Sequence, residues 1–148
     1  MFEEMKQITL SGNAYPMKCD NLVLEKIQDK YGDLTDYENK LSGFIPKVDE
    51  NGEKVRNEEG YLIGRYEIPE LKILNEALVW FVQEGLEIER EELNREHPKV
   101  NDRTLIRQID MTPAELGKIL HEEVARCFER KNVETTQRKA EEQENPKK

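Results

Sequence analysis

The sequence predicts a single α+β domain in which helices dominate, covering residues 1–130 and followed by a polar tail at 131–148. Three observations support this fold class. A short N-terminal stretch alternates apolar and polar residues around a Gly-Asn pair, as β-hairpins do. Several later stretches repeat apolar residues at helical spacing. A chain of 148 residues also has the usual length of one domain and can bury a core.

The stretch 71–85 carries the most apolar helical pattern, and we expect the domain to pack around it. Two adjacent rows of apolar residues follow the helical period, namely Leu71, Leu74, Leu78, Phe81 and Val82, with Ile73, Ala77 and Trp80 beside them. A helix that is apolar around most of its circumference is buried, either in its own core or against a partner. Pro69 suits the first helical turn, and Gly85 can end the helix or mark a bend.

The N-terminal hairpin is predicted from Ile8 and Leu10, which alternate with polar residues before the turn signal Gly12-Asn13. A second extended run follows this turn signal. Pro16 in that run has no N–H to donate to a ladder, so we expect an edge strand there.

Two helices are expected after the hairpin. Asp20 or Asn21 can cap the first, which ends at Gly32. The second is shorter and begins near residue 35, where Thr35 and Glu38 have the spacing of a capping box.

Residues 44–68 interrupt the helical pattern with a largely polar segment. Asn51-Gly52 and Gly60 are turn signals within it. Two interpretations stay open. The segment is a hairpin that pairs Ile45–Val48 with residues 61–66, or it is a mobile loop.

The C-terminal half is predicted to hold two further helices. The central helix can extend towards Pro98, which disfavours helix at and just before its own position. Asp102 is expected to cap a short helix. Thr112, Pro113 and Glu115 then give the clearest helix start in the chain, with a capping hydroxyl, a first-turn proline and an acid at capping-box spacing.

The composition indicates which parts of the chain lie outside the core and which partners are disfavoured. Charged residues make up 37% and apolar residues 36%, which is polar for a compact domain, and the tail at 131–148 is almost free of apolar residues. We therefore expect this tail to be disordered. A formal charge of −9 disfavours nucleic acid and anionic membranes as partners.

The sequence also indicates a cytoplasmic protein. No apolar run approaches the roughly 20 residues of a membrane span, and no signal-like segment opens the chain. Two cysteines far apart in the sequence do not make a disulfide framework, which fits a reducing compartment.

We expect no catalytic residue, no metal ion and no cofactor, and hence no enzyme. His97 and His121 each stand alone, without the clustered cysteine and histidine that zinc requires. The pairs Glu91-Glu92 and Glu122-Glu123 are interpreted as solvated helix faces. The chain lacks a phosphate-binding loop, a dinucleotide fingerprint and a nucleophile elbow.

An alternative function comes from residues 102–128, which read as helix, short turn and helix. This order is typical of a helix-turn-helix DNA-binding regulator, whose second helix enters the major groove. Glu115 and Lys118 stand where base readout usually needs Arg, Asn or Gln, and the acidic charge opposes phosphate contact.

The order of elements resembles the tail assembly chaperones of long-tailed phages and prophages of Gram-positive bacteria, over most of residues 6–130. The N-terminal residues that carry the resemblance are Tyr15, Pro16, Asp20, Asn21, Leu22, Leu24, Glu25, Ile27, Tyr31 and Gly32. Further matches are Ala77–Val82 with Glu84-Gly85, and the helix start at Thr112, Pro113, Glu115 and Leu116. The polar segment at 49–62 is not part of the family pattern.

The resemblance implies a non-enzymatic binding role. Such chaperones coat the tape measure protein and keep it soluble before the tail tube polymerises, and they are absent from the mature virion. The implied partner is the tape measure protein in the bacterial host cytosol, with the tail tube protein and a second copy of this chain as further candidates. An apolar groove could take an amphipathic helix of the tape measure protein.

The candidate contact residues for such a groove lie on the two most apolar helices. They are Val79, Trp80, Phe81, Leu116, Leu120 and Phe128. The same residues also fit an ordinary core, so a core role and a contact role both remain open at this point.

Overall fold

The computed structural model describes residues 5–131, which form a helix-dominated α+β fold with an N-terminal two-stranded hairpin and five helices. The predicted fold class is therefore confirmed. The predicted disorder of the tail at 131–148 lies outside the described residues, except for Lys131 at the end of the last helix.

Strands β1 (Lys6–Leu10) and β2 (Asn13–Met17) form the predicted antiparallel hairpin. Its turn is one residue earlier than the predicted Gly12-Asn13. The turn residues are Ser11 and Gly12, with φ values of 49° and 82°. Positive φ at both positions is the type I′ geometry that matches the twist of paired strands. One face of the hairpin is buried, through Ile8, Leu10 and Met17.

Helices α1 (Asn21–Tyr31) and α2 (Leu34–Ser42) each begin at an aspartate that accepts hydrogen bonds from backbone N–H groups. Asp20 caps α1, as predicted. The predicted start of α2 at residue 35 is wrong, because Asp33 caps this helix. Its Oδ1 accepts from the N–H groups of residues 35 and 36 at 2.8 and 3.2 Å, which satisfies two free amides at once.

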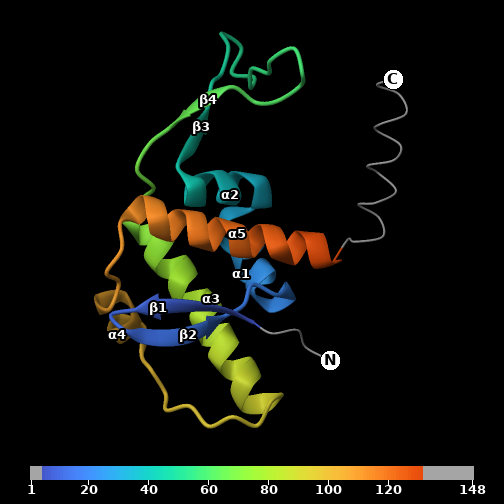
Figure 1. Ribbon diagram of the computed structural model, residues 1–148. Helices are drawn as coiled ribbons and strands as arrows, with labels where there is room; N and C mark the ends of the chain where they lie inside the picture. Colours follow the sequence, from blue (N-terminus) through green and yellow to red (C-terminus); the bar gives the residue numbers. More distant parts are fainter. Residues whose placement is uncertain (1–4, 132–148) are drawn as a thin grey trace.

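Of the two interpretations of residues 44–68, the structure shows the hairpin, although Val48 pairs with Lys54 and not with residues 61–66. Strand β3 (Phe44–Pro46) pairs antiparallel with β4 (Gly64–Tyr66). We call residues 44–66 the arm, and Figure 1 shows it standing away from the helices. A hydrogen bond of 2.9 Å from the Glu67 N–H to the Gly43 carbonyl oxygen closes its base. Only glycine fits at position 43, because φ is 82° and a Cβ would lie 2.0 Å from the Glu67 carbonyl oxygen.

Two equivalent turns, eight residues apart, build the outer part of the arm. Asp49 Oδ1 accepts from the N–H groups of residues 51 and 53 at 2.9 and 3.0 Å. Asn57 Oδ1 accepts from the N–H groups of residues 59 and 61 at the same two distances. Lys47, Val55 and Ile63 occupy equivalent positions beside these turns. Their backbones form a cycle of three hydrogen bonds, in which the N–H of residue 47 donates to the carbonyl oxygen of 63, that of 63 to 55, and that of 55 to 47. The polar sequence is therefore ordered by its Asx turns and glycines rather than by a core.

Helix α3 (Leu71–Glu91) is the central helix, and it runs six residues past Gly85. Gly85 therefore does not end the helix. A Cβ at this position would lie 2.5 Å from the Pro16 carbonyl oxygen of β2, so the glycine lets the hairpin lie directly on the helix. The Lys18 N–H, just after β2, donates to the Phe81 carbonyl oxygen at 2.9 Å. The strand β2, which contains Pro16, therefore packs against α3 (Figure 1).

Helices α4 (Asp102–Arg107) and α5 (Pro113–Lys131) complete the described chain. The cap of α4 is Asn101 rather than the predicted Asp102, since the Asn101 side chain accepts from the Thr104 N–H at 2.8 Å. The predicted cap of α5 is confirmed by the hydrogen bond of 3.2 Å from the Glu115 N–H to Thr112 Oγ1. α5 contacts both α2 and α3, and its apolar stripe enters the core that α3 organises.

Tyr31 and Tyr37 give a matched test of hydrogen bonding in this core. Their rings lie 5.0 Å apart, yet only the Tyr31 hydroxyl has a partner, donating to Glu76 at 2.7 Å. The fully buried Tyr37 hydroxyl has no hydrogen-bond partner among the described residues. We expect Tyr31→Phe to lower the free energy of unfolding by about 1 kcal/mol, and Tyr37→Phe to leave it unchanged or raise it slightly. Urea denaturation checks both variants, and a larger loss for Tyr37→Phe would contradict this description.

Candidate partner-binding surface

Most of the predicted contact residues lie in the core. Phe81 and Leu120 are fully buried, Leu116 is 1% exposed and Val79 is 9% exposed. They are buried because α3 and α5 pack against each other and against the elements around them. In this form of the protein their side chains contact their own domain and do not face a partner.

Trp80 and Phe128 are the two predicted contact residues at the edge of the core. Both are half-buried and pack against the core cluster. Each presents part of its ring to solvent, but they lie on helices whose neighbouring apolar residues point inward. These two rings by themselves do not form the expected groove.

The helix-turn-helix alternative needs the first turns of α5 to be open to a DNA groove. Leu116 and Gly117 are buried there, and a Cβ at Gly117 would lie 2.2 Å from the Leu41 carbonyl oxygen of α2. One turn later, His121 lies 3.3 Å from the Glu38 carboxylate of α2, which raises the pKa of His121. α2 thus covers this face of α5. The exposed face carries Glu115, Lys118 and Glu122, a net charge of −1, whereas contact with DNA phosphates favours a basic face.

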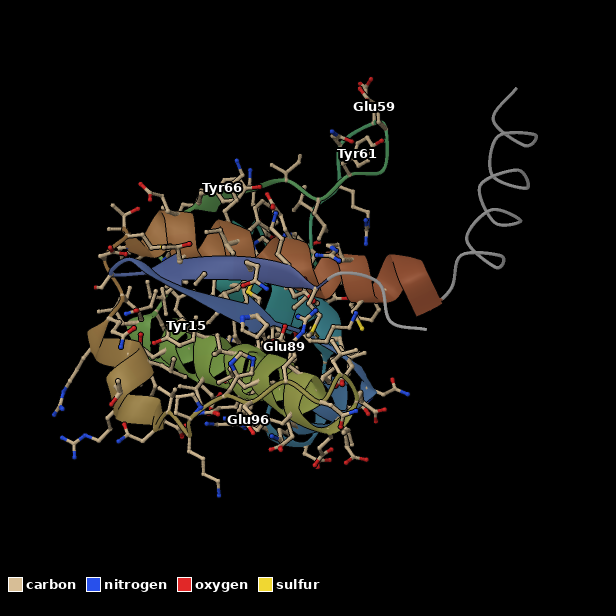
Figure 2. The ribbon with its side chains drawn as sticks, turned by 60° about the horizontal axis from the view of Figure 1, so that its bottom comes forward. Tyr15, Glu59, Tyr61, Tyr66, Glu89 and Glu96 are labelled. Atoms are coloured by element: carbon tan, nitrogen blue, oxygen red, sulfur yellow. The ribbon has the colours of Figure 1, made fainter. Side chains whose placement is uncertain are left out.

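The exposed apolar side chains gather instead on and beside the arm. Six of the eight large apolar side chains that are exposed within residues 5–131 lie between positions 48 and 71. We call these six the arm surface: Val48, Tyr61, Ile63, Tyr66, Ile68 and Leu71. Figure 2 shows Tyr61 on the outer loop of the arm and Tyr66 nearer its root. Exposed apolar groups gathered in one region of a molecule are candidates for an interaction site.

The arm leaves these side chains exposed because its sheet has only two strands and no layer covers it. Tyr66 is 73% exposed although its ring packs at 5.2 Å from the ring of Phe44. Ile68, just after β4, is 78% exposed. A two-stranded ribbon has little apolar area to bury within itself. The arm surface is therefore available to a partner.

A pocket of about 360 Å³ lies at the root of the arm, where the arm meets α2 and α3. We call it the root pocket. Its apolar lining comes from Phe44, Ile45, Pro46, Ile68, Pro69 and Ile73. Asp36, Glu67 and Glu70 add carboxylates to the lining, and Lys40 adds a cation. Lys54 pairs with Asp36 and Arg65 pairs with Glu67, which leaves Glu70 as the rim carboxylate without an ion pair among the described residues. The root pocket is thus an apolar cavity with a charged rim, which we call the acidic rim after its three carboxylates, and it shares Ile68 with the arm surface.

The residues of the arm surface were not predicted from the sequence as contact residues. Tyr61, Ile63, Tyr66 and Ile68 are apolar residues spaced two or three apart within a polar segment. That pattern could have indicated exposed apolar groups, because so short an extended segment has no second layer in the sequence to cover it.

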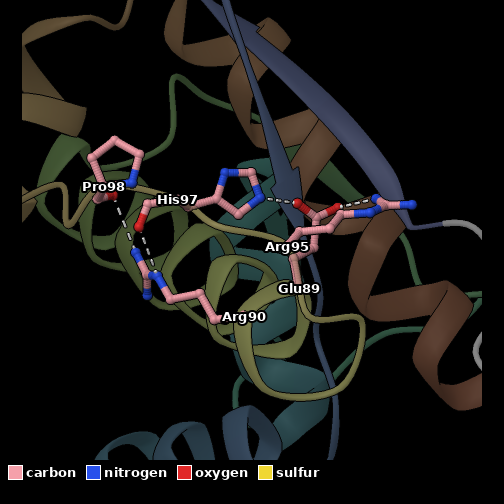
Figure 3. A network of polar contacts seen from close by, with 5 residues as sticks. All are labelled: Glu89, Arg90, Arg95, His97 and Pro98. Atoms are coloured by element: carbon pink, nitrogen blue, oxygen red, sulfur yellow. Dashed lines mark hydrogen bonds and ion pairs between the residues drawn. The ribbon is translucent and has the colours of Figure 1, made fainter.

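A network of polar contacts joins the end of α3 to the loop that follows, as Figure 3 shows. The buried carboxylate of Glu89 pairs with Arg95 at 2.9 Å and with His97 Nε2. The Arg90 guanidinium donates to the carbonyl oxygens of His97 and Pro98, each at 3.2 Å. Both Glu89 oxygens are occupied by side chains of this loop, so the network holds the loop against α3 rather than presenting a free base.

The two cysteines, far apart in sequence, lie near each other in the core. Cys19 is fully buried, and its backbone N–H donates to Glu123 on α5 at 3.0 Å. A hydrogen bond with Cys127 and burial both raise the pKa of the Cys19 thiol. Such a thiol stays protonated, whereas a nucleophilic cysteine needs the thiolate. Cys19 is therefore a core residue.

Metal and membrane sites were also sought among the described residues. Within 5–131, no group of three or more His, Cys, Asp or Glu side chains is placed to hold a metal ion. None of the helices in that range combines the length and apolar character that crossing a membrane requires.

The carboxyl group of Glu84 on α3 has a raised pKa, which leads to a prediction about stability and pH. Burial and the neighbouring Asp20 carboxyl raise the pKa of Glu84 to about 8, while Lys26 opposes this shift. A raised carboxyl pKa adds stability below the unfolded pKa, and this stability is lost as pH rises towards 8. We expect Glu84→Gln to be neutral near pH 5 and to raise the free energy of unfolding by roughly 1 kcal/mol near pH 9, after allowance for solvent screening.

Denaturant unfolding at several pH values checks the expectation for Glu84. The matched control is Glu91→Gln, which removes an exposed carboxylate from the same helix. An equal change in the free energy of unfolding for the two variants at both pH values would show that burial and Asp20 do not raise the pKa of Glu84.

The sequence matches no protein-family model, and comparison with curated proteins and with solved structures finds no significant match either.

Proposed function

We propose that this protein is a non-enzymatic tail assembly chaperone that binds a phage tape measure protein and keeps it soluble until the tail tube polymerises. The family resemblance of the sequence motivates the identity of the partner. The observation that carries a binding role is the arm surface, where six large apolar side chains are exposed in an otherwise highly charged protein.

The charge of the protein supports the same role. A formal charge of −9 keeps a complex soluble even when its partner is apolar over much of its length. An aggregation-prone amphipathic helix needs its apolar face covered, and the arm surface offers apolar area for that purpose. Action in the host cytosol and absence from the mature virion belong to this proposal.

Co-expression with the tape measure protein encoded nearby tests the proposal. We expect the tape measure protein to be insoluble alone, and to become soluble and co-elute in size-exclusion chromatography when this chain is present. An unrelated acidic protein of similar size and charge is the matched control, because charge alone could raise solubility. Unchanged solubility with separate elution would overturn the proposal.

A further inference from the structure

We propose that the root pocket, together with Tyr66, Ile68 and Leu71, is the docking site for the apolar face of a basic amphipathic helix. This inference rests on the proposed function, for which it names the surface and the chemistry of the bound segment. An apolar side chain of the helix enters the root pocket, and lysine or arginine side chains beside it face the acidic rim.

The pocket is formed by parts of the fold that are held in place before any partner binds. Its walls come from α2, β3, the start of α3 and the segment between β4 and α3. The hydrogen bond between Glu67 and Gly43 closes the base of the arm at this point. Pro69 is buried there, and its Cγ would lie 3.3 Å from a Cβ added at Gly43, so its ring packs close to this glycine. A preformed pocket lowers the entropic cost of docking.

The size and lining of the pocket suit side chains rather than a large ligand. The volume of about 360 Å³ is at the low end for small-molecule sites, and Ile68, which lines the pocket, is 78% exposed. An amphipathic helix presents apolar groups at i, i+3, i+4 and i+7 on one face. One group can fill the pocket while its neighbours contact Tyr66 and Leu71, which are 73% and 59% exposed.

Charge selects a basic helix over an acidic one. Three carboxylates line the pocket, and two of them already have a cationic partner: Asp36 lies 3.5 Å from Lys54, and Glu67 pairs with Arg65 at 2.8 Å. Glu70 is the lining carboxylate that has no ion pair among the described residues, so it is the one a cation of the partner would meet first. Glu70 is exposed at the start of α3 and makes no capping hydrogen bond to that helix. Across residues 47–70 there are seven acidic and four basic side chains, a net charge of −3. A helix with lysine or arginine flanking its apolar face therefore complements this surface, and an acidic one is repelled.

Two synthetic peptides with the same apolar face test the charge requirement. One carries lysine beside a leucine stripe at i, i+3, i+4 and i+7, and the other carries glutamate at the same positions. Fluorescence anisotropy with the full chain measures both dissociation constants at low and high salt. We expect the lysine peptide to bind at least tenfold more tightly at low salt, with a smaller difference at high salt. Equal binding of the two peptides would overturn the proposal.

Surface variants locate the binding site. Ile68→Ser should weaken binding of the lysine peptide about tenfold, because it removes an exposed apolar contact at the pocket mouth. Glu70→Gln should weaken it about threefold at low salt only. The matched controls are Leu22→Ser and Glu25→Gln on α1, which remove an exposed leucine and an exposed carboxylate elsewhere. Circular dichroism melts confirm that each variant is folded. Equal losses in the Ile68 and Leu22 variants would overturn the proposal.

Sedimentation of the full chain tests a second copy as the occupant. A dimer that Ile68→Ser dissociates, without binding of the lysine peptide, would overturn the proposal in favour of self-association.

Failure of the surface and failure of the proposed function give different results. If the tape measure protein co-elutes equally with the wild type and the Ile68→Ser variant, the docking site is overturned while the chaperone function stands. If the Ile68→Ser and Glu70→Gln variants weaken binding of the lysine peptide as expected, but the tape measure protein never co-elutes, the docking site stands and the proposed partner is wrong.

Discussion

Replacing Gly85 with alanine is expected to lower the free energy of unfolding by about 3 kcal/mol, although the same change usually stabilises a helix interior by about 1 kcal/mol. The reason is the contact between α3 and β2. An added Cβ would lie 2.5 and 2.6 Å from two backbone atoms of Pro16, which cannot move without lifting the hairpin from the helix. That movement would also strain the hydrogen bond of 2.9 Å from Lys18 to Phe81.

Denaturant unfolding, with circular dichroism as the signal, measures the effect. Glu87→Ala is the matched control, because Glu87 is exposed on the same helix and alanine favours helix there. A Gly85→Ala variant more stable than the wild type would show that the hairpin does not lie directly on α3 in solution.

The second large effect is expected from Phe81→Ala, which should lower the free energy of unfolding by about 4 kcal/mol. Phe81 is fully buried among the core residues, so its removal leaves a cavity. Trp80→Ala should cost about 2 kcal/mol, since the Trp80 ring is only half-buried. Leu22→Ala, on the exposed face of α1, should change stability by less than about 0.5 kcal/mol.

The contrast between Phe81 and Trp80 separates a core role from a contact role. Because Trp80 is the only tryptophan in the chain, far-ultraviolet circular dichroism replaces fluorescence as the signal. If the Phe81→Ala variant kept the wild-type free energy of unfolding and lost only its binding of the tape measure protein, Phe81 would be a contact residue and its buried position would be wrong.

Local signals explain why much of the fold could be predicted. The hairpin, the cap at Asp20 and the start of α5 at Thr112 depend on residues close in sequence, which determine their own hydrogen bonds. The errors at Asp33 and Asn101 concern which of two neighbouring polar side chains reaches the free amides. Gly85 was harder to interpret, because its role depends on β2, which is far away in the sequence.

The candidate binding surface could not be predicted in the same way. Trp80 and Phe81 lie in the most apolar helical stretch of the sequence, and this apolar character places them in or against the core. Tyr66 and Ile68 look ordinary in the sequence. They matter because nothing in the fold covers them, and this depends on how all other apolar residues are already packed.

The repeated turns of the arm close on one another and make its outer part a single cooperative unit. Lys47, Val55 and Ile63 are spaced eight residues apart and exchange backbone hydrogen bonds with one another, so one eight-residue unit occupies the same kind of place as the next. Because these three hydrogen bonds form a closed cycle, removal of one eight-residue unit would leave one backbone N–H and one carbonyl oxygen of the other two units without their partners. The outer part of the arm is therefore expected to form, or to be lost, as a whole.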